Sequence, residues 1–155
     1  MSQGTEEVAA KGYVLDDNIG YLLRRCYQES TALFSGSAPV SLSAPRFAAL
    51  VRLVERGPLS QNRLGRLISA DAATIKGIVG CLRELGAVEV SRDPHDKRQR
   101  LVSVTDHGRQ LHAAGVVASQ DTAADLLAGL SDGEAKMFVE LLQKVAGRRS
   151  ASGEM

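Results

Sequence analysis

The side chains best suited to bind a charged partner are concentrated in a polar loop, residues 92–100, with the sequence RDPHDKRQR. Its basic side chains are Arg92, His95, Lys97, Arg98 and Arg100. Guanidinium groups suit a narrow DNA minor groove, because the negative potential is deepest there. A solvated hairpin tip would explain the same charges. The position of the loop, directly after two short helices, favours the nucleic-acid interpretation.

Two helix segments upstream carry further groups that suit nucleic acid. Ser60, Gln61 and Asn62 open a short helix expected at 61–68, and a helix start with free N–H groups attracts phosphate. Ser60 also serves as an ordinary N-cap there. The next helix, expected at 72–85 behind an Asp71 cap, has an outward face of small and polar residues: Ala72, Ala73, Thr74, Lys76, Gly77 and Gly80.

This outward face differs from that of an ordinary solvent-exposed helix, which is rich in Glu, Lys and Arg. Small side chains let a helix approach another surface closely, while Thr74 and Lys76 can bond base edges or phosphates. A face for a protein partner would explain the same residues. The choice between the two depends on the elements around the helix.

Those elements follow from hydrophobic periodicity and capping residues. The pattern predicts helices at 15–34, 44–56, 61–68, 72–85, 106 to about 130, and from 132 onward, with strands at 88–91 and 100–104. The last helix opens with a capping box, Ser131 to Glu134. Two helices joined by a short turn and followed by a hairpin indicate a winged helix-turn-helix, so the fold class is mostly α with a small β-hairpin wing (α+β).

The first and last helices are expected to bury apolar faces. The members of these faces are Ile19, Leu22, Leu23, Cys26, Tyr27, Leu33 and Phe34 in the first helix and Met137, Phe138, Leu141, Leu142 and Val145 in the last. Two amphipathic helices at opposite ends of a small chain need something to cover them.

Bulk composition limits the remaining possibilities. The 155 residues are 44% hydrophobic and 24% charged, as expected for one globular unit. The net charge is +1, yet residues 43–100 carry +5 and each flanking part −2, which places a polyanion site in the middle.

Without a long apolar run or a leader-like start, a cytoplasmic location is expected. The histidines lack ligand spacing and no phosphate loop or catalytic triad appears, so we expect no metal, no cofactor and no enzymatic activity.

The wing sequence carries a resemblance to a known family. RDPHDKRQRLVSVTDHG resembles the wing signature of the MarR family, at Asp96, Arg98, Leu101-Val102, Thr105 and Gly108, and the similarity extends over about residues 15–147. The resemblance implies a homodimer with intertwined terminal helices that binds double-stranded DNA at a pseudo-palindromic operator. It also implies that helix 72–85 enters the major groove, that Arg98 reaches the minor groove and that Asp96 supports Arg98.

The same resemblance gives a domain organisation. We expect a single MarR-like domain at 14–147, with a DNA-binding lobe at about 43–104 and dimerisation helices at about 15–35 and 106–147. Residues 1–13 and 148–155 are expected to be disordered tails.

The first helix and the helix-turn-helix resemble those of regulators of aromatic-acid catabolism, including ones that respond to hydroxycinnamoyl-CoA or hydroxynicotinate. This implies a repressor released by a small aromatic acid or its CoA thioester. Tyr21 and Arg25 lie one helical turn apart and can converge on one anionic ligand, with His107 at the start of the fifth helix. Tyr21 at a dimer interface and Arg25 paired with Glu29 is the alternative.

Two further interpretations remain open. Peroxide-sensing members of the family carry a reactive cysteine where this chain has Gly20. We expect Cys26 and Cys81 to be unreactive core thiols, and a redox-responsive regulator using either of them is the alternative. The other alternative is a winged-helix module that binds protein, since winged helices also mediate protein contacts.

Overall fold

The computed structural model describes residues 12–147, so nearly all of the two predicted tails lies outside the described residues. A short 3₁₀ turn, η1 (Leu15–Asp17), precedes α2 (Ile19–Ser37). The central part contains α3 (Ala44–Arg56), β1 (Leu59–Ser60), α4 (Gln61–Leu67), α5 (Ala72–Glu84), β2 (Val88–Arg92) and β3 (Arg100–Val104). The chain closes with α6 (Asp106–Leu126) and α7 (Asp132–Gly147).

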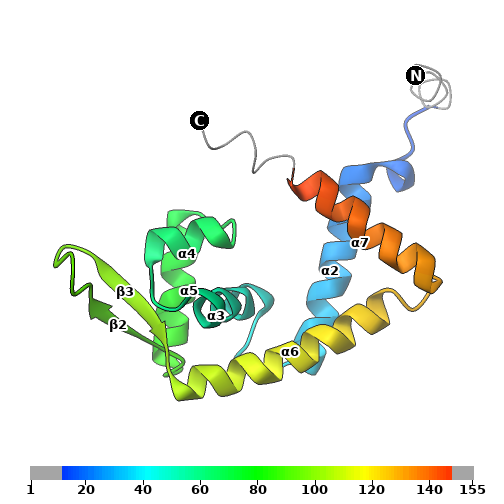
Figure 1. Ribbon diagram of the computed structural model, residues 1–155. Helices are drawn as coiled ribbons and strands as arrows, with labels where there is room; N and C mark the ends of the chain where they lie inside the picture. The colour runs from blue at the N-terminus through cyan, green and yellow to red at the C-terminus, as the bar shows by residue number, and fades with distance from the viewer. Residues whose placement is uncertain (1–11, 148–155) are drawn as a thin grey trace.

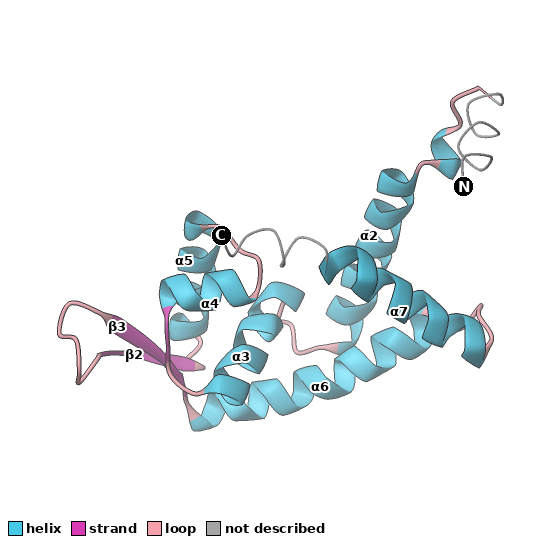
Figure 2. Cartoon of the chain, turned by 45° about the horizontal axis from the view of Figure 1, so that its top comes forward, coloured by secondary structure: helices cyan, strands magenta, loops and turns pink. Residues whose placement is uncertain are grey.

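The molecule has two parts joined by α6 (Figure 1). At one end, α3, α4 and α5 pack together beside the β2–β3 hairpin, while α2 and α7 lie at the other end. Figure 2 shows the same arrangement from a second side, with α6 running beneath both parts. The predicted winged helix-turn-helix and the α+β class are thus confirmed.

A small core holds the helix-turn-helix together. Its fully buried side chains are Leu42, Leu50, Leu53, Leu64, Ile75, Leu82 and Val102. They come from α3, α4, α5, β3 and the segment before α3, so each element of the lobe contributes apolar area to one cluster. This common core fixes the orientation of α5 relative to the wing.

The wing contains one strand that the sequence analysis missed. The sheet has three strands in the order β1-β3-β2, and Leu59 and Ser60 of β1 pair with Val102 and Leu101 of β3. Two residues are too few to show the alternation that identifies a strand. Because β1 directly precedes α4, this pairing ties the start of the helix-turn-helix to the wing.

Some helix ends depart from expectation and one cap agrees. The first helix is α2 at Ile19–Ser37 rather than 15–34, because Leu15–Asp17 forms the separate turn η1 and the Asn18 side chain caps α2. Helix α6 ends at Leu126 rather than near 130, and the Leu127 N–H closes it by donating to the Ala123 carbonyl at 3.1 Å. The capping box of α7 is confirmed: the Ser131 N–H donates to Glu134 at 2.9 Å, and the Glu134 N–H donates to the Ser131 hydroxyl at 3.3 Å.

The expectation that the terminal helices bury their apolar faces is wrong for the single chain. In α2 only Phe34 is buried, and α7 contains no buried residue. Ile19 is 71% exposed, Met137 61% and Val145 65%. Periodicity identifies which face of a helix is apolar but says nothing about which chain covers it.

The cysteine expectation also needs correction. Cys26 is exposed on α2, and Cys81 is half-buried on α5, so neither is a fully buried core thiol in the chain. Cys26 shares the uncovered face of α2, which is the reason for its exposure. None of the helices within residues 12–147 is long and apolar enough to span a membrane.

Candidate nucleic-acid interface

Helix α5 is positioned by its cap and by its buried side. The Asp71 carboxylate accepts a hydrogen bond from the Thr74 N–H at 2.7 Å, and Ile75, Ile78 and Leu82 anchor the helix in the core. The hydrogen bonds from Thr74, chiefly its backbone N–H, hold the pKa of Asp71 below the usual range. The opposite side faces solvent. All six residues of the predicted outward face are exposed: Ala72, Ala73, Thr74, Lys76, Gly77 and Gly80.

The turn before α5 depends on a close approach between two backbones. A Cβ added at Gly65 would lie 3.1 Å from the Ala70 carbonyl oxygen and 3.3 Å from a methyl carbon of Ile75. Ser69, in the same turn, has a positive φ of 56°. At the other end of α4 the Ser60 hydroxyl accepts from the Arg63 N–H at 3.3 Å, which confirms its capping role.

The wing loop is held by its two aspartates. Asp93 accepts hydrogen bonds from the backbone N–H groups of His95 (2.8 Å) and Asp96 (3.4 Å). Asp96 accepts from the Arg98 N–H at 3.0 Å. Asp96 therefore contacts the backbone of Arg98, and the Arg98 guanidinium forms no ion pair with another residue in 12–147. Asp93 was not among the residues predicted from the sequence to have a role, although Asp-Pro turns often contain such bonds.

A tight joint connects α5, the wing and α6. The Thr105 hydroxyl donates to the Gly86 carbonyl at 2.6 Å, and the Thr105 N–H donates to the Ala87 carbonyl at 3.0 Å. The same hydroxyl accepts from the Gly108 N–H at 3.0 Å. A Cβ at Gly108 would lie only 2.0 Å from the Ala87 carbonyl oxygen, so this position requires glycine.

The predicted effector residues are divided between two places. The Arg25 guanidinium lies over the Tyr21 ring, 6.0 Å from its centroid, so these two residues meet on α2. His107 is exposed in the first turn of α6. None of the three lines the cavity of about 450 Å³ that the structure shows between α2 and the lobe.

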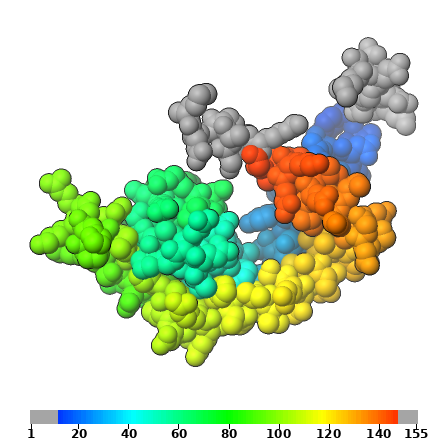
Figure 3. Space-filling model, viewed as in Figure 1, coloured from blue at the N-terminus to red at the C-terminus, as the bar shows by residue number. Residues whose placement is uncertain are grey.

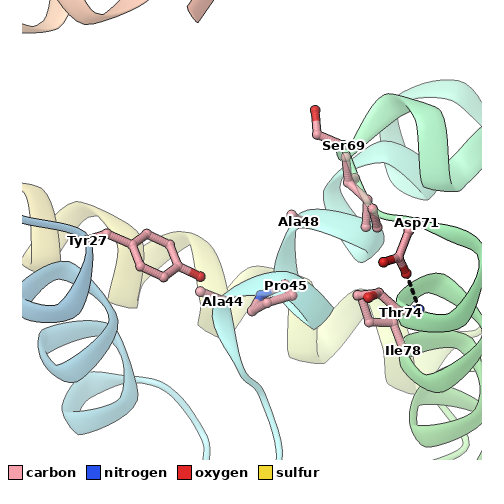
Figure 4. Close-up of a pocket in the computed structure, with 10 residues that line it drawn as sticks. Tyr27, Ala44, Pro45, Ala48, Ser69, Asp71, Thr74 and Ile78 are labelled. Atoms are coloured by element: carbon pink, nitrogen blue, oxygen red, sulfur yellow. Dashed lines mark hydrogen bonds between the residues drawn. The ribbon is translucent and has the colours of Figure 1, made fainter. Parts of the chain in front are cut away.

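That cavity is lined by parts of the helix-turn-helix and by one aromatic side chain of α2. Figure 4 shows the Tyr27 ring on one side and Asp71, Thr74 and Ile78 on the other, with Ser69 above. The full lining is Tyr27, Ala44, Pro45, Ala48, Ile68, Ser69, Ala70, Asp71, Thr74 and Ile78. The space-filling view shows a hollow between the lobe and α7 (Figure 3). None of these residues was predicted from the sequence as an effector contact, because Tyr27 and the 68–71 turn meet only in the folded chain.

A helix-turn-helix with an exposed small-residue helix and a basic wing defines a winged-helix DNA-binding protein. The model of the MarR family matches residues 42–99, which span α3, the turn, α5 and the wing loop. The chain belongs to the MarR family of DNA-binding transcription regulators.

Three relatives illustrate the similarity. The transcriptional repressor NicR of Pseudomonas putida is 34% identical over 134 residues, which cover 86% of this chain and 85% of NicR. A probable transcriptional regulator from Pseudomonas aeruginosa has 43% identity and a TM-score of 0.81 over 85% of this chain and 99% of that one. BpsR of Bordetella bronchiseptica, whose DNA binding is regulated by 6-hydroxynicotinic acid, has 32% identity and a TM-score of 0.75 over 83% and 98%.

Proposed function

We propose that this chain is a homodimeric repressor that binds a pseudo-palindromic operator and leaves it when a small aromatic acid or its CoA thioester binds. One observation carries the DNA-binding part: the exposed face of α5 stands beside a wing in which the Arg98 guanidinium forms no ion pair with a carboxylate of residues 12–147. The names of NicR, a repressor, and of BpsR, regulated by a hydroxylated aromatic acid, support the rest.

In this proposal, α5 enters the major groove and the wing follows the adjacent minor groove. Thr74 and Lys76 reach base edges, and the small residues around them permit close approach. Arg98 inserts into the minor groove. The remaining contacts, to phosphates and groove edges, come from Ser60, Gln61, Asn62, Arg92, His95, Lys97 and Arg100.

Dimerisation is supported by the uncovered apolar faces of α2 and α7. Leu141 is 52% exposed and Leu142 36%, on a helix that has no buried residue. A second copy of the chain would cover these side chains and remove them from water. It would also present two α5 helices to two successive half-sites.

The cavity beside Tyr27 is a suitable place for an effector. Its volume of about 450 Å³ is within the range of small-molecule sites, and it is lined by apolar side chains, three hydroxyl groups and the Asp71 carboxylate. Tyr27, Ser69 and Thr74 can hydrogen-bond a ring hydroxyl. No Lys or Arg is among its lining residues, so the effector carboxylate would face the open side of the cavity. The Tyr21–Arg25 pair and His107 remain a second predicted contact set.

Operator binding is tested with labelled intergenic DNA from beside the gene and with random DNA of equal length. Thr74→Ala and Lys76→Ala should each cost about 1–3 kcal/mol on the operator and much less on random DNA, because base contacts are sequence-specific. Aromatic acids and their CoA thioesters are then titrated against the complex. A protein-interaction module predicts no specific DNA binding, and equal losses on both DNAs would limit these residues to phosphate contacts.

A further inference from the structure

The wing loop contains a chain of hydrogen bonds that begins at one carboxylate. Asp93 accepts from the N–H groups of His95 and Asp96, and its own N–H donates to the Gln99 carbonyl at 2.9 Å. The Gln99 N–H in turn donates to the Asp96 carbonyl at 2.9 Å, and the Asp96 carboxylate accepts from Arg98. Each link fixes the backbone that supports the next one, and the last link is Arg98.

Asp93 differs from the rest of the loop in its environment. It is half-buried, whereas every other residue from 92 to 100 is exposed. It directly follows the last residue of β2, where the wing loop begins, and it lines a cavity of about 290 Å³ together with Ser60, Arg63 and His95. Asp93 therefore lies beside the start of α4, where the wing loop meets the rest of the lobe.

A carboxylate at this position has an electrostatic cost when DNA binds. A negative charge close to the phosphates repels them, so removing it should by itself strengthen binding. The loop nevertheless places two carboxylates among its cations, and both accept bonds from backbone N–H groups rather than from the guanidinium of Arg98. The two carboxylates therefore fix the conformation of the loop, and the Arg98 guanidinium remains available to bind DNA.

We propose that Asp93 is a positioning residue for DNA recognition: its carboxylate orders the wing loop so that Arg98 is presented to the groove. The proposal rests on the proposed function of the wing. It gives Asp93 a role that acts through Arg98, with no direct contact to DNA required.

The test compares two substitutions that remove the same charge. Asp93→Ala removes the acceptor and should lower operator affinity about tenfold, a loss within the range of one groove contact. Asp93→Asn keeps an oxygen acceptor that suits the same turn, so its affinity should equal or exceed that of the wild type. Glu89→Ala, an exposed carboxylate on β2, serves as the charge control and should not weaken binding.

The Arg98→Ala background separates positioning from a direct or global effect. If Asp93 acts through Arg98, adding Asp93→Ala to Arg98→Ala should change the affinity by less than about twofold. Thermal unfolding of Asp93→Ala should match the wild type, because the loop lies outside the buried core.

Two results would overturn the proposal. One is an Asp93→Ala variant that binds as tightly as the wild type or more tightly, and the other is an undiminished tenfold loss in the Arg98→Ala background. Failure of the proposed function is recognised separately, because Arg98→Ala alone would then leave operator affinity unchanged.

Discussion

At the scale of single residues, we expect DNA binding by the wing to depend on the Arg98 guanidinium, which the rest of the loop leaves unpaired. Its backbone is fixed by Asp96 at 3.0 Å, while its guanidinium has no carboxylate partner in residues 12–147. Arg98→Ala should weaken operator binding by about 1–3 kcal/mol. It should also reduce the slope of log K against the logarithm of the salt concentration by about one for each wing. Anisotropy titrations at several salt concentrations measure both quantities. Lys136→Ala, which removes a cation from exposed α7, is the control, and wild-type affinity for Arg98→Ala would contradict the wing assignment.

At the scale of elements, α5 retains two glycines that its own chain does not require. A Cβ at Gly77 or Gly80 would meet nothing within 4 Å, yet glycine within a helix costs about 0.5–1 kcal/mol relative to alanine. We predict that Gly77→Ala raises the free energy of unfolding by about this amount and lowers operator affinity, because the added methyl group meets the DNA. Urea unfolding and DNA titration should change in opposite directions. Gly36→Ala in α2, also in open space, should leave DNA binding unchanged. Unaltered affinity for Gly77→Ala would show that α5 does not approach DNA closely.

The extent to which the sequence predicted these features depends on how local their causes are. Ser60, Asp71 and Ser131 were identified as caps because each acts on an N–H three residues away. Strand β1 was missed because its only signal is its pairing with β3. Asp93 was missed because its hydrogen bonds form only in the folded loop. The residues that line the cavity were missed because Tyr27 and Ser69 are far apart in sequence. Cys26 was placed in the core because periodicity does not reveal which chain covers a face.

At the scale of the whole molecule, the uncovered faces of α2 and α7 predict the oligomeric state. Leu141→Asp should cost the single chain little, since the side chain is 52% exposed, but should place a charge in each half of the dimer interface. Because dimerisation can bury only the exposed half of each leucine, losing the two costs roughly 1.5–3 kcal/mol, and the buried charge adds to this, so the dimer dissociation constant should rise more than tenfold. Sedimentation equilibrium measures this change, with Gln143→Asp, exposed on the same helix, as the control. A Leu141→Asp protein that remains as dimeric as the wild type would refute the model.

The joint at Thr105 and Gly108 has a mechanical consequence. Because two hydrogen bonds and a close backbone contact tie the end of α5 to the start of α6, a tilt of α6 is transmitted directly to the DNA-binding lobe at its N-terminal end. The 21 residues of α6 span roughly 31 Å at 1.5 Å per residue. A tilt of about 5° at the far end therefore moves the tip by about 3 Å, which is close to the 3.4 Å rise of one base pair. In the proposed dimer, small adjustments among α2, α6 and α7 would be sufficient to change the spacing of the two α5 helices, so that they no longer match two successive major grooves.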